Sequence, residues 1–312
     1  GKIPLGILRT VVPAAPDAWI TALQNYGTMS FGEVASTAIK YAREGITVHP
    51  TMAKFLSRYQ DNYRMWPSNS NIWQKNGQPL EVGDLLVQTD LAASIQYMVD
   101  QEAGAVKAGR QQGLQAARDA FYIGDIATKI VEYHKQNGGL MTAEDMASYR
   151  TPIEEPLSIN FRGTEVFSCR PWCQGPVLLQ MLNILNDIDL QRMGHNSTEY
   201  IHYLAETIKL SFADRERYYG DPNYVNVPIE QLLSSEFAKK RQQNIDPTKA
   251  WPEMPSAGVI KGFEGTSIVS NTNSAPSFSD PDTSYTCAMD KDGNVCSITP
   301  SDVSFESPVI PG

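Results

Sequence analysis

The chain has few cysteines, no long apolar run and no excess of basic residues. Four cysteines in 312 residues are too few for a scaffold held together by disulfides. No apolar stretch approaches the roughly twenty residues that a membrane-spanning helix needs. The 26 Lys and Arg residues are outnumbered by 35 Asp and Glu residues, which gives a net charge of −9. Binding to a phosphate backbone usually needs a basic face, so a nucleic-acid partner is not expected.

Several signatures of catalysis and cofactor binding are also missing. The sequence contains no Gly-x-Ser-x-Gly elbow, no phosphate-binding loop, no His-Glu-x-x-His motif and no dinucleotide fingerprint. Cys169 and Cys173 have the spacing of half a zinc site, but no second half follows at ligand spacing. We therefore expect neither a metal nor an organic cofactor. A metal hydrolase that uses these cysteines and the scattered histidines stays an alternative, which metal analysis would test.

The composition is that of an ordinary globular protein, with 41% hydrophobic and 20% charged residues. A chain of this length can bury a core without disulfides. Apolar periodicity predicts helices within 13–42, 51–62 and 84–120, a helix up to His134, a buried helix over 178–185 and a long amphipathic helix over 197–219. The Asn-, Pro- and Gly-rich stretch 66–84 is predicted to be a surface loop. Charged residues of the long helix are expected to pair along its surface: Glu206, Asp214, Arg215, Glu216 and Arg217.

Two β-hairpins are predicted. The first spans 157–169 and turns at Arg162-Gly163. The second pairs 284–290 with 295–299 through a turn that contains Asp292-Gly293, a strong hairpin signal. Cys287 and Cys296 fall on the two strands of the second hairpin, and we expect them to remain thiols.

A segment rich in Pro, Gly and Ser, 251–282, precedes the second hairpin and is predicted to be flexible. It leads directly into Asp282 and Thr283. In a hairpin centred near Asp292, the hydroxyls of Thr299 and Ser301 would lie near that of Thr283. A threonine becomes a nucleophile when a base adjoins it, and its own α-amino group can serve if the chain is cut before it. The same pattern also fits a β-branched residue that merely begins a strand.

Five segments carry a resemblance to a known family. They are VPAAPDAW at 12–19, DAFYIGDIA at 119–127, GGLMTAEDMASYR at 138–150, ETIKLSFADR at 206–215 with GDP at 220–222, and TSYTCAMDKDGN at 283–294. Taken in this order, they resemble the γ-glutamyltransferase (γ-glutamyltranspeptidase) family of N-terminal-nucleophile hydrolases. The resemblance implies an α+β fold, a four-layer αββα sandwich, made as one precursor that cuts itself.

In this family the threonine that begins the small subunit is the nucleophile, and it corresponds to Thr283. The resemblance places the cleaved bond at Asp282-Thr283 and gives Ser301 the role of a hydroxyl beside the nucleophile. Thr299 and Ser284 are then candidates for substrate contacts. The family usually has Thr-Thr-His where this chain has Thr283-Ser284-Tyr285. A substrate-binding asparagine of the family falls on Val303, which argues against a conventional γ-glutamyl pocket and towards the acylases of the superfamily.

The resemblance also divides the chain. It implies a large-subunit portion over 1–250, a segment before the cleavage site over 251–282, and the start of a small subunit over 283–312. The family's carboxylate-binding arginine would precede Gly1, and its acidic amine-binding residue and oxyanion glycines would follow Gly312. Without the oxyanion donors, the rate is expected to fall by roughly a hundredfold or more. The implied partners are the remainder of the small subunit and a small amide or γ-glutamyl substrate, with processed chains forming a homodimer or heterotetramer.

Two hypotheses of different class follow. The first is a γ-glutamyltransferase-like amide hydrolase or acyltransferase, of the kind linked to glutathione metabolism, which works through an acyl-enzyme. The second is an unprocessed, inactive family member that acts as a binding or structural module. The changed neighbours of the nucleophile, Ser284 and Tyr285, motivate the second. Both an exported and a cytoplasmic location remain open.

Overall fold

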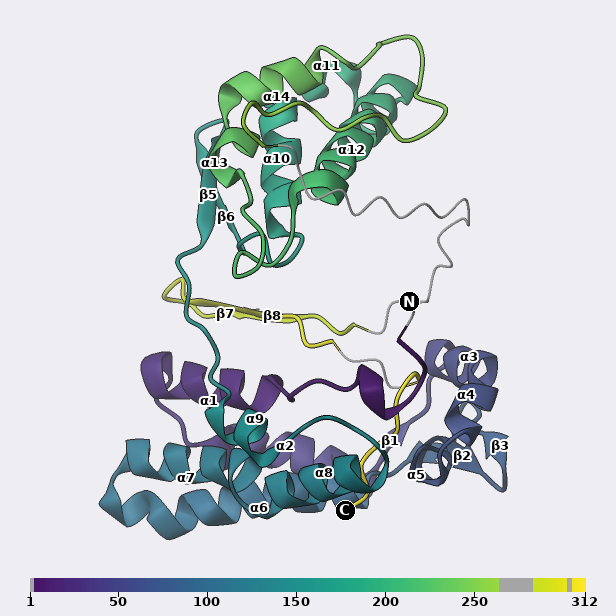
Figure 1. Cartoon of the computed structure of the whole chain (residues 1–312), viewed down its shortest axis with the longest axis vertical. Coiled ribbons are helices and arrows are strands. Elements are labelled where there is room, and N and C mark those ends of the chain that lie inside the picture. The colour runs from purple at the N-terminus through teal and green to yellow at the C-terminus, as the bar shows by residue number, and fades with distance from the viewer. Residues whose placement is uncertain (1–2, 264–282, 302–304) are drawn as a thin grey trace. The chain divides into compact units, whose positions relative to one another are not determined.

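A computed structural model describes residues 3–263, 283–301 and 305–312. The chain forms two compact units, unit 1 with Gly1–Pro152 and Phe278–Gly312, and unit 2 with Ile153–Ser277 (Figure 1). No helix within the described ranges is long and apolar enough to cross a membrane. The structural boundary between the units thus falls inside the predicted large-subunit portion 1–250.

Unit 1 is built mainly of helices. They are η1 (Ile7–Arg9), α1 (Ala15–Tyr26), α2 (Phe31–Glu44), α3 (Pro50–Arg58), α4 (Gln60–Arg64), α5 (Pro67–Trp73), α6 (Thr89–Ala105), η2 (Val106–Ala108), α7 (Arg110–Tyr122), α8 (Asp125–Gln136) and α9 (Ala143–Ser148). Two short antiparallel strand pairs join them, β1 (Ile46–Thr47) with β4 (Leu85–Leu86), and β2 (Gln74–Lys75) with β3 (Gln78–Pro79). The helices predicted within 13–42, 51–62 and 84–120 are therefore confirmed.

The prediction of a surface loop over 66–84 is wrong. The stretch contains α5 and the β2–β3 pair. Pro67 occupies the first turn of α5, where its missing N–H costs nothing and its fixed φ favours the helix. Asn76 and Gly77 both have positive φ, at 53° and 75°, and so make the tight turn between the strands. The Asn and Gly content that indicated a loop instead marks one turn inside a folded stretch.

Helix starts in unit 1 follow the sequence signals. Glu33 N donates to Ser30 Oγ at 3.1 Å and Ser30 N donates to Glu33 Oε2 at 2.7 Å, so a capping box begins α2. The buried carboxylate of Glu102 in α6 accepts from Phe31 N and Gly32 N, each at 2.8 Å. The core between these helices contains Ile20, Phe31, Ala35, Ile39, Met98, Leu114, Ala117 and Ala120.

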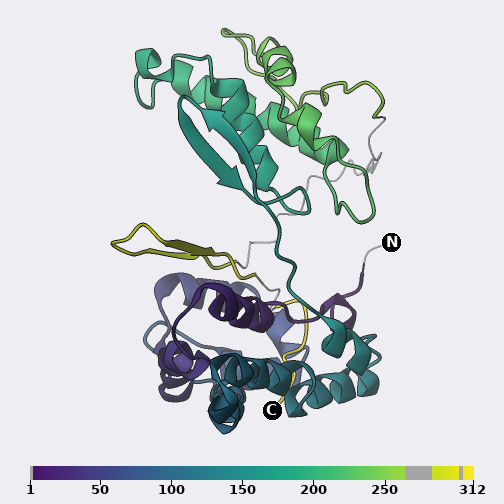
Figure 2. The ribbon, with the colours of Figure 1, turned by 90° about the vertical axis from the view of Figure 1, so that its left-hand side faces the viewer.

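Unit 2 consists of one hairpin and five helices within its described residues. The hairpin pairs β5 (Leu157–Phe161) with β6 (Thr164–Ser168), as predicted. The helices are α10 (Gly175–Leu185), α11 (Leu190–Met193), α12 (Thr198–Tyr218), α13 (Ile229–Leu232) and α14 (Ser235–Gln242). The hairpin lies along the helices of the unit, against α10 (Figure 2). The predicted helices over 178–185 and 197–219 correspond to α10 and α12.

An ion pair lies in the core of unit 2. Asp214 of α12 is completely buried, and its Oδ2 lies 3.0 Å from Arg241 Nε of α14. The other carboxylate oxygen accepts from Gly258 N at 2.6 Å. Burial raises the pKa of Asp214, although Arg241 and these hydrogen bonds lower it. The prediction that Asp214 pairs along the surface of its own helix is therefore wrong, whereas Arg215 and Glu216 do pair there.

Unit 1 also contains a second hairpin, β7 (Thr286–Met289) with β8 (Val295–Ile298), and the tail 305–312. Phe305 is buried among Val48, Leu56, Tyr63, Leu80 and Leu86. Farther along the tail, Asn69 Nδ2 donates to Ser307 O at 3.0 Å and Val309 N donates to Asn69 Oδ1 at 2.7 Å. The tail that follows the hairpin is thus held firmly by the α3–α5 region.

Candidate active site

The candidate site is built on the register of the β7–β8 hairpin. Thr286 faces Ile298 and Met289 faces Val295, and the isolated bridge between Thr283 and Ser301 continues the same register. Pro300 faces Ser284 in this register and has no N–H to donate, so only one ladder bond forms there, from Ser284 N to Pro300 O at 3.1 Å. The paired region therefore extends back to Thr283, as the sequence predicted.

The register also explains why the two hydroxyls meet. Hydrogen bonds from Ser284 N to Pro300 O and from Asp290 N to Asn294 O mark the alternate, hydrogen-bonded pairs of the hairpin. Thr283 and Ser301 consequently form a non-hydrogen-bonded pair, in which facing side chains come closest. Thr283 Oγ1 lies 2.8 Å from Ser301 Oγ, and either hydroxyl can be the donor. Both residues are exposed.

Strand alternation sorts the neighbouring residues into two faces. Tyr285 and its partner Thr299 share the face of Thr283 and Ser301, and Ser297 Oγ donates to Tyr285 Oη at 3.3 Å on that face. Hydroxyl groups therefore line one face of the hairpin. Ser284 lies on the other face, so Thr299 shares a face with the nucleophile candidate and Ser284 does not. Asp282 and Val303, both named from the sequence, lie outside the described residues.

The hairpin turn depends on a residue that the sequence interpretation missed. Asp290 Oδ1 accepts from the N–H groups of Asp292 and Asn294, each at 2.9 Å, and Oδ2 accepts from Asn294 Nδ2 at 2.8 Å. The hydrogen bond from the Asn294 side chain, with those from backbone N–H groups, lowers the pKa of Asp290. Gly293 has a φ of 86°, as the Asp-Gly signal predicted. An acidic residue just before such a turn is a signal that could have identified Asp290.

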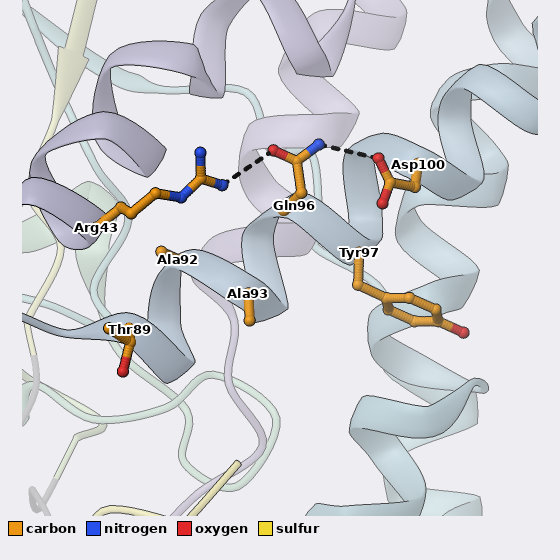
Figure 3. A pocket seen from close by; sticks show the side chains of 7 residues that line it. All are labelled: Arg43, Thr89, Ala92, Ala93, Gln96, Tyr97 and Asp100. Carbon is orange, nitrogen blue, oxygen red and sulfur yellow. Dashed lines mark hydrogen bonds between the residues drawn. The ribbon is translucent and has the colours of Figure 1, made fainter.

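A shallow groove of about 400 Å³ lies on α6, far along the chain from Thr283 (Figure 3). Arg43 Nη2 donates to Gln96 Oε1 at 3.5 Å and Gln96 Nε2 donates to Asp100 Oδ1 at 2.9 Å across it. These polar side chains satisfy one another, and none of the predicted site residues lines the groove. The groove gives no sign of a catalytic role.

Cys169 and Cys173 do not belong to a metal cluster within the part of the chain that the structure describes. No group of three or more His, Cys, Asp or Glu side chains is arranged there to hold a metal ion. All four cysteines are free thiols. The described residues therefore offer no donor set that favours the metal-hydrolase alternative.

Comparison with known proteins identifies relatives over nearly the whole chain. The sequence profile of the γ-glutamyltranspeptidase family matches residues 2–312. The glutathione hydrolase proenzyme of Escherichia coli K12 is 34% identical over 294 residues, 94% of this chain and 46% of that protein. The acylase ACY 1 proenzyme of Pseudomonas sp. SE83 is 30% identical over 298 residues, 95% of this chain and 47% of that protein.

The fold of the chain is also similar to that of a solved structure. The crystal structure of Helicobacter pylori γ-glutamyltranspeptidase is similar, with a TM-score of 0.73 and 29% identity over 84% of this chain and 71% of that one. The chain spans about half the length of the curated relatives that it matches. The Escherichia coli and Pseudomonas relatives are both described as proenzymes, the first of a glutathione hydrolase and the second of an acylase.

Proposed function

The chain belongs to the γ-glutamyltranspeptidase family, and from that premise we propose that Thr283 is the nucleophile of an amide hydrolase or acyltransferase. The observation that carries this proposal is the 2.8 Å separation between the Thr283 and Ser301 hydroxyls. A threonine hydroxyl is a weak nucleophile until a neighbouring group orients it and a base removes its proton. Ser301 supplies the orienting hydroxyl from the facing strand.

The first step in the proposal is self-cleavage of the precursor. The Thr283 hydroxyl attacks the carbonyl carbon of Asp282, and the acyl group moves from the Thr283 nitrogen to its oxygen to give an ester. Water then hydrolyses the ester, which leaves a carboxylate on Asp282 and a free α-amine on Thr283. The description of both relatives as proenzymes supports this step.

In turnover, the freed α-amine accepts the hydroxyl proton of Thr283 while the oxygen attacks the substrate amide. The leaving amine takes the proton, and an acyl ester remains on Thr283. Water or an acceptor amine then releases the acyl group. The Ser301 hydroxyl, by donating to Thr283 Oγ1, stabilises the charge that develops on the attacking oxygen. No cofactor is required for these steps.

The substrate is proposed to be a small amide whose recognition differs from that of a conventional γ-glutamyl group. Tyr285 stands on the Thr283 face where the family resemblance leads us to expect histidine, and its hydroxyl is engaged by Ser297. Val303 replaces the expected asparagine in the sequence. We therefore expect hydrolysis to exceed transfer and γ-glutamyl anilides to be poor substrates. Strong, saturable γ-glutamyl transfer to dipeptides would refute this assignment.

The proposal extends to the architecture. The family fold is proposed to be completed as a four-layer αββα sandwich by a small-subunit remainder that follows Gly312 in the precursor. Residues 251–282 are proposed to be the segment before the cleavage site. Processed chains would then assemble as a homodimer or heterotetramer, and the oxyanion donors would come from the remainder.

Substitutions in the precursor test the role of Thr283. Thr283→Ala should abolish self-cleavage and lower amide hydrolysis by about a thousandfold or more, and Thr283→Ser should retain part of both. Ser301→Ala should lower hydrolysis by about tenfold to a hundredfold, as expected for one hydrogen bond to a charged oxygen. Thr286→Ala is the matched control, because Thr286 is exposed on the opposite face of the same hairpin. Normal hydrolysis by Thr283→Ala would refute the assignment, and an uncut, inactive wild-type precursor would favour the binding module.

A further inference from the structure

The four free thiols fall into two pairs that differ in geometry. Cys169 and Cys173 lie in the loop between β6 and α10, whereas Cys287 and Cys296 lie on β7 and β8. A disulfide needs two Cβ atoms about 3.5–4.5 Å apart with side chains that point towards each other. Cys169 and Cys173 both lie beside Gly175, whereas Cys287 and Cys296 point to opposite faces of a hairpin.

The loop folds Cys173 back onto the chain next to Cys169. Cys173 N donates to Arg170 O at 3.2 Å, which closes a turn over 170–173. The Cys173 sulfur lies 3.5 Å from the same carbonyl oxygen, and Gly175 N donates to it at 3.4 Å. The sulfur of Cys173 is thus held between the carbonyl group of Arg170 and the first residue of α10, Gly175.

The start of α10 also packs directly on Cys169. A Cβ placed on Gly175 would lie 2.6 Å from Cys169 O and 2.8 Å from Cys169 N, so only glycine allows this approach. Burial raises the pKa of the Cys173 thiol, the Gly175 N–H lowers it, and the adjacent Cys169 thiol raises it further. Gly175 thus touches both cysteines, the sulfur of Cys173 and the backbone of Cys169, with Cys169 exposed and Cys173 half-buried.

Neighbouring side chains fix the loop in this shape. Trp172 Nε1 donates to Glu154 Oε2 at 2.6 Å, and Arg170 Nη1 donates to Glu155 O at 3.3 Å. On the other side of the loop, Arg215 Nη1 donates to Gln174 Oε1 at 2.6 Å. These bonds involve neither sulfur, so they hold the turn while leaving both thiols free to react.

The strand pair has the opposite geometry. Cys287 faces Ser297 and Cys296 faces Ala288, so the two cysteines belong to adjacent cross-strand pairs. Adjacent pairs point to opposite faces of a hairpin. The side chains of Cys287 and Cys296 therefore cannot meet without breaking the strand register, even though their backbones are near each other.

We propose that Cys169 and Cys173 form an oxidisable dithiol that a small-molecule disulfide converts to an intramolecular disulfide. The thiolate of exposed Cys169 attacks one sulfur of the reagent and displaces one thiol, which leaves a mixed disulfide on Cys169. The thiolate of Cys173 then attacks the Cys169 sulfur and displaces the second thiol. The protein loses two hydrogens, both of which end on the released thiols, and the reagent is reduced. This inference does not depend on the proposed function.

Intact mass and peptide mapping after treatment with 2-hydroxyethyl disulfide test the proposal. The loop pair should lose two hydrogens and its linked peptides should contain Cys169 and Cys173, whereas exposed Cys287 and Cys296, which cannot resolve a mixed disulfide with each other, should each carry one reagent adduct. Dithiothreitol should restore the thiols. The Cys287→Ser/Cys296→Ser variant, which removes only the strand pair, should lose two hydrogens and carry no adduct.

Single substitutions distinguish the two sulfur atoms. Cys173→Ser should accumulate one reagent adduct on Cys169, because nothing resolves the mixed disulfide, and Cys169→Ser should not form the loop disulfide. Thiol titration of both folded variants, with circular dichroism matching the wild type, separates chemistry from misfolding. A persistent adduct on Cys169 in the wild type, a link between Cys287 and Cys296, or four unreacted thiols would each overturn the proposal.

Discussion

The β5–β6 and β7–β8 hairpins differ in how they are supported. The β5–β6 hairpin alternates half-buried and exposed residues and packs on α10, so one of its faces is structural. The β7–β8 hairpin is exposed along both strands apart from Ile298. An isolated two-stranded hairpin is only marginally stable in water. The comparison indicates that β5–β6 is stabilised through its face, and β7–β8 through its turn and through the tail that follows it.

The largest expected loss of stability comes from replacing Phe305, the buried residue in the tail that follows the β7–β8 hairpin. Phe305 is 3% exposed, and its ring stacks on Tyr59 with centroids 4.1 Å apart. Replacing it with alanine removes this packing and leaves a cavity, so Phe305→Ala should destabilise unit 1 by about 3–5 kcal/mol. Urea unfolding monitored by hydrogen exchange should show the lower free energy of unfolding in unit 1 and not in unit 2.

The control for that variant lies in the other hairpin. Phe167 of β6 is 58% exposed, so Phe167→Ala should change the free energy of unfolding by no more than about 0.5 kcal/mol. Equal losses for the two substitutions would contradict the view that β7–β8 is held through its tail.

A smaller difference in stability is expected between substitutions on the strands of the two hairpins. Ile159 of β5 is half-buried opposite Val166, so Ile159→Ala should cost about 1–2 kcal/mol in the free energy of unfolding. Met289 at the end of β7 is 75% exposed, and Met289→Ala should cost less than about 0.5 kcal/mol. Chemical denaturation measures both, and the reverse order of the two losses would show that β7–β8 has a buried face.

The smallest effect concerns the β7–β8 turn and depends on pH. Hydrogen bonds from Asn294 and neighbouring N–H groups hold the pKa of Asp290 below its usual 3.8. Because the folded-state pKa is lowered, the turn gains stability that is fully present above pH 3.8 and lost as pH falls through the lowered pKa. The Asn294 amide shift in NMR spectra should report this titration. Asp290→Asn should abolish it and Asp292→Asn should not; a titration that follows Asp292 instead would contradict the geometry.

The second hairpin could be predicted well from the sequence, and for a physical reason. The Asp-Gly turn and the alternation of residues fix a register, and a register decides which residues face each other. Those local facts placed the hydroxyls of both Thr299 and Ser301 near Thr283, and the register in the structure pairs Thr283 with Ser301. Local patterns do not state which face is covered, so the exposure of this hairpin and the support from Phe305 had to come from the structure.

The interpretations that failed depended on contacts between distant segments. Asp214 looked like a surface residue because its helix also carries neighbouring charged residues. Its actual partners, Arg241 and Gly258, lie on a later helix and a later loop. Similarly, Asn69 lies in the stretch that was predicted to be a loop, and its hydrogen bond to Ser307 O in the tail could not be predicted from the local sequence. Periodicity identifies a helix, but the segment packed against it decides whether a charge is buried.

The central claim is that Thr283 begins a new chain and is the nucleophile. Its most direct test is intact-mass measurement, with N-terminal sequencing, of the precursor purified without added protease. The account predicts two chains, one of which begins with Thr283, and a single uncut chain for Thr283→Ala. A wild-type precursor that hydrolyses amides while its Asp282-Thr283 bond stays intact, or that is cut only at another bond, would contradict it.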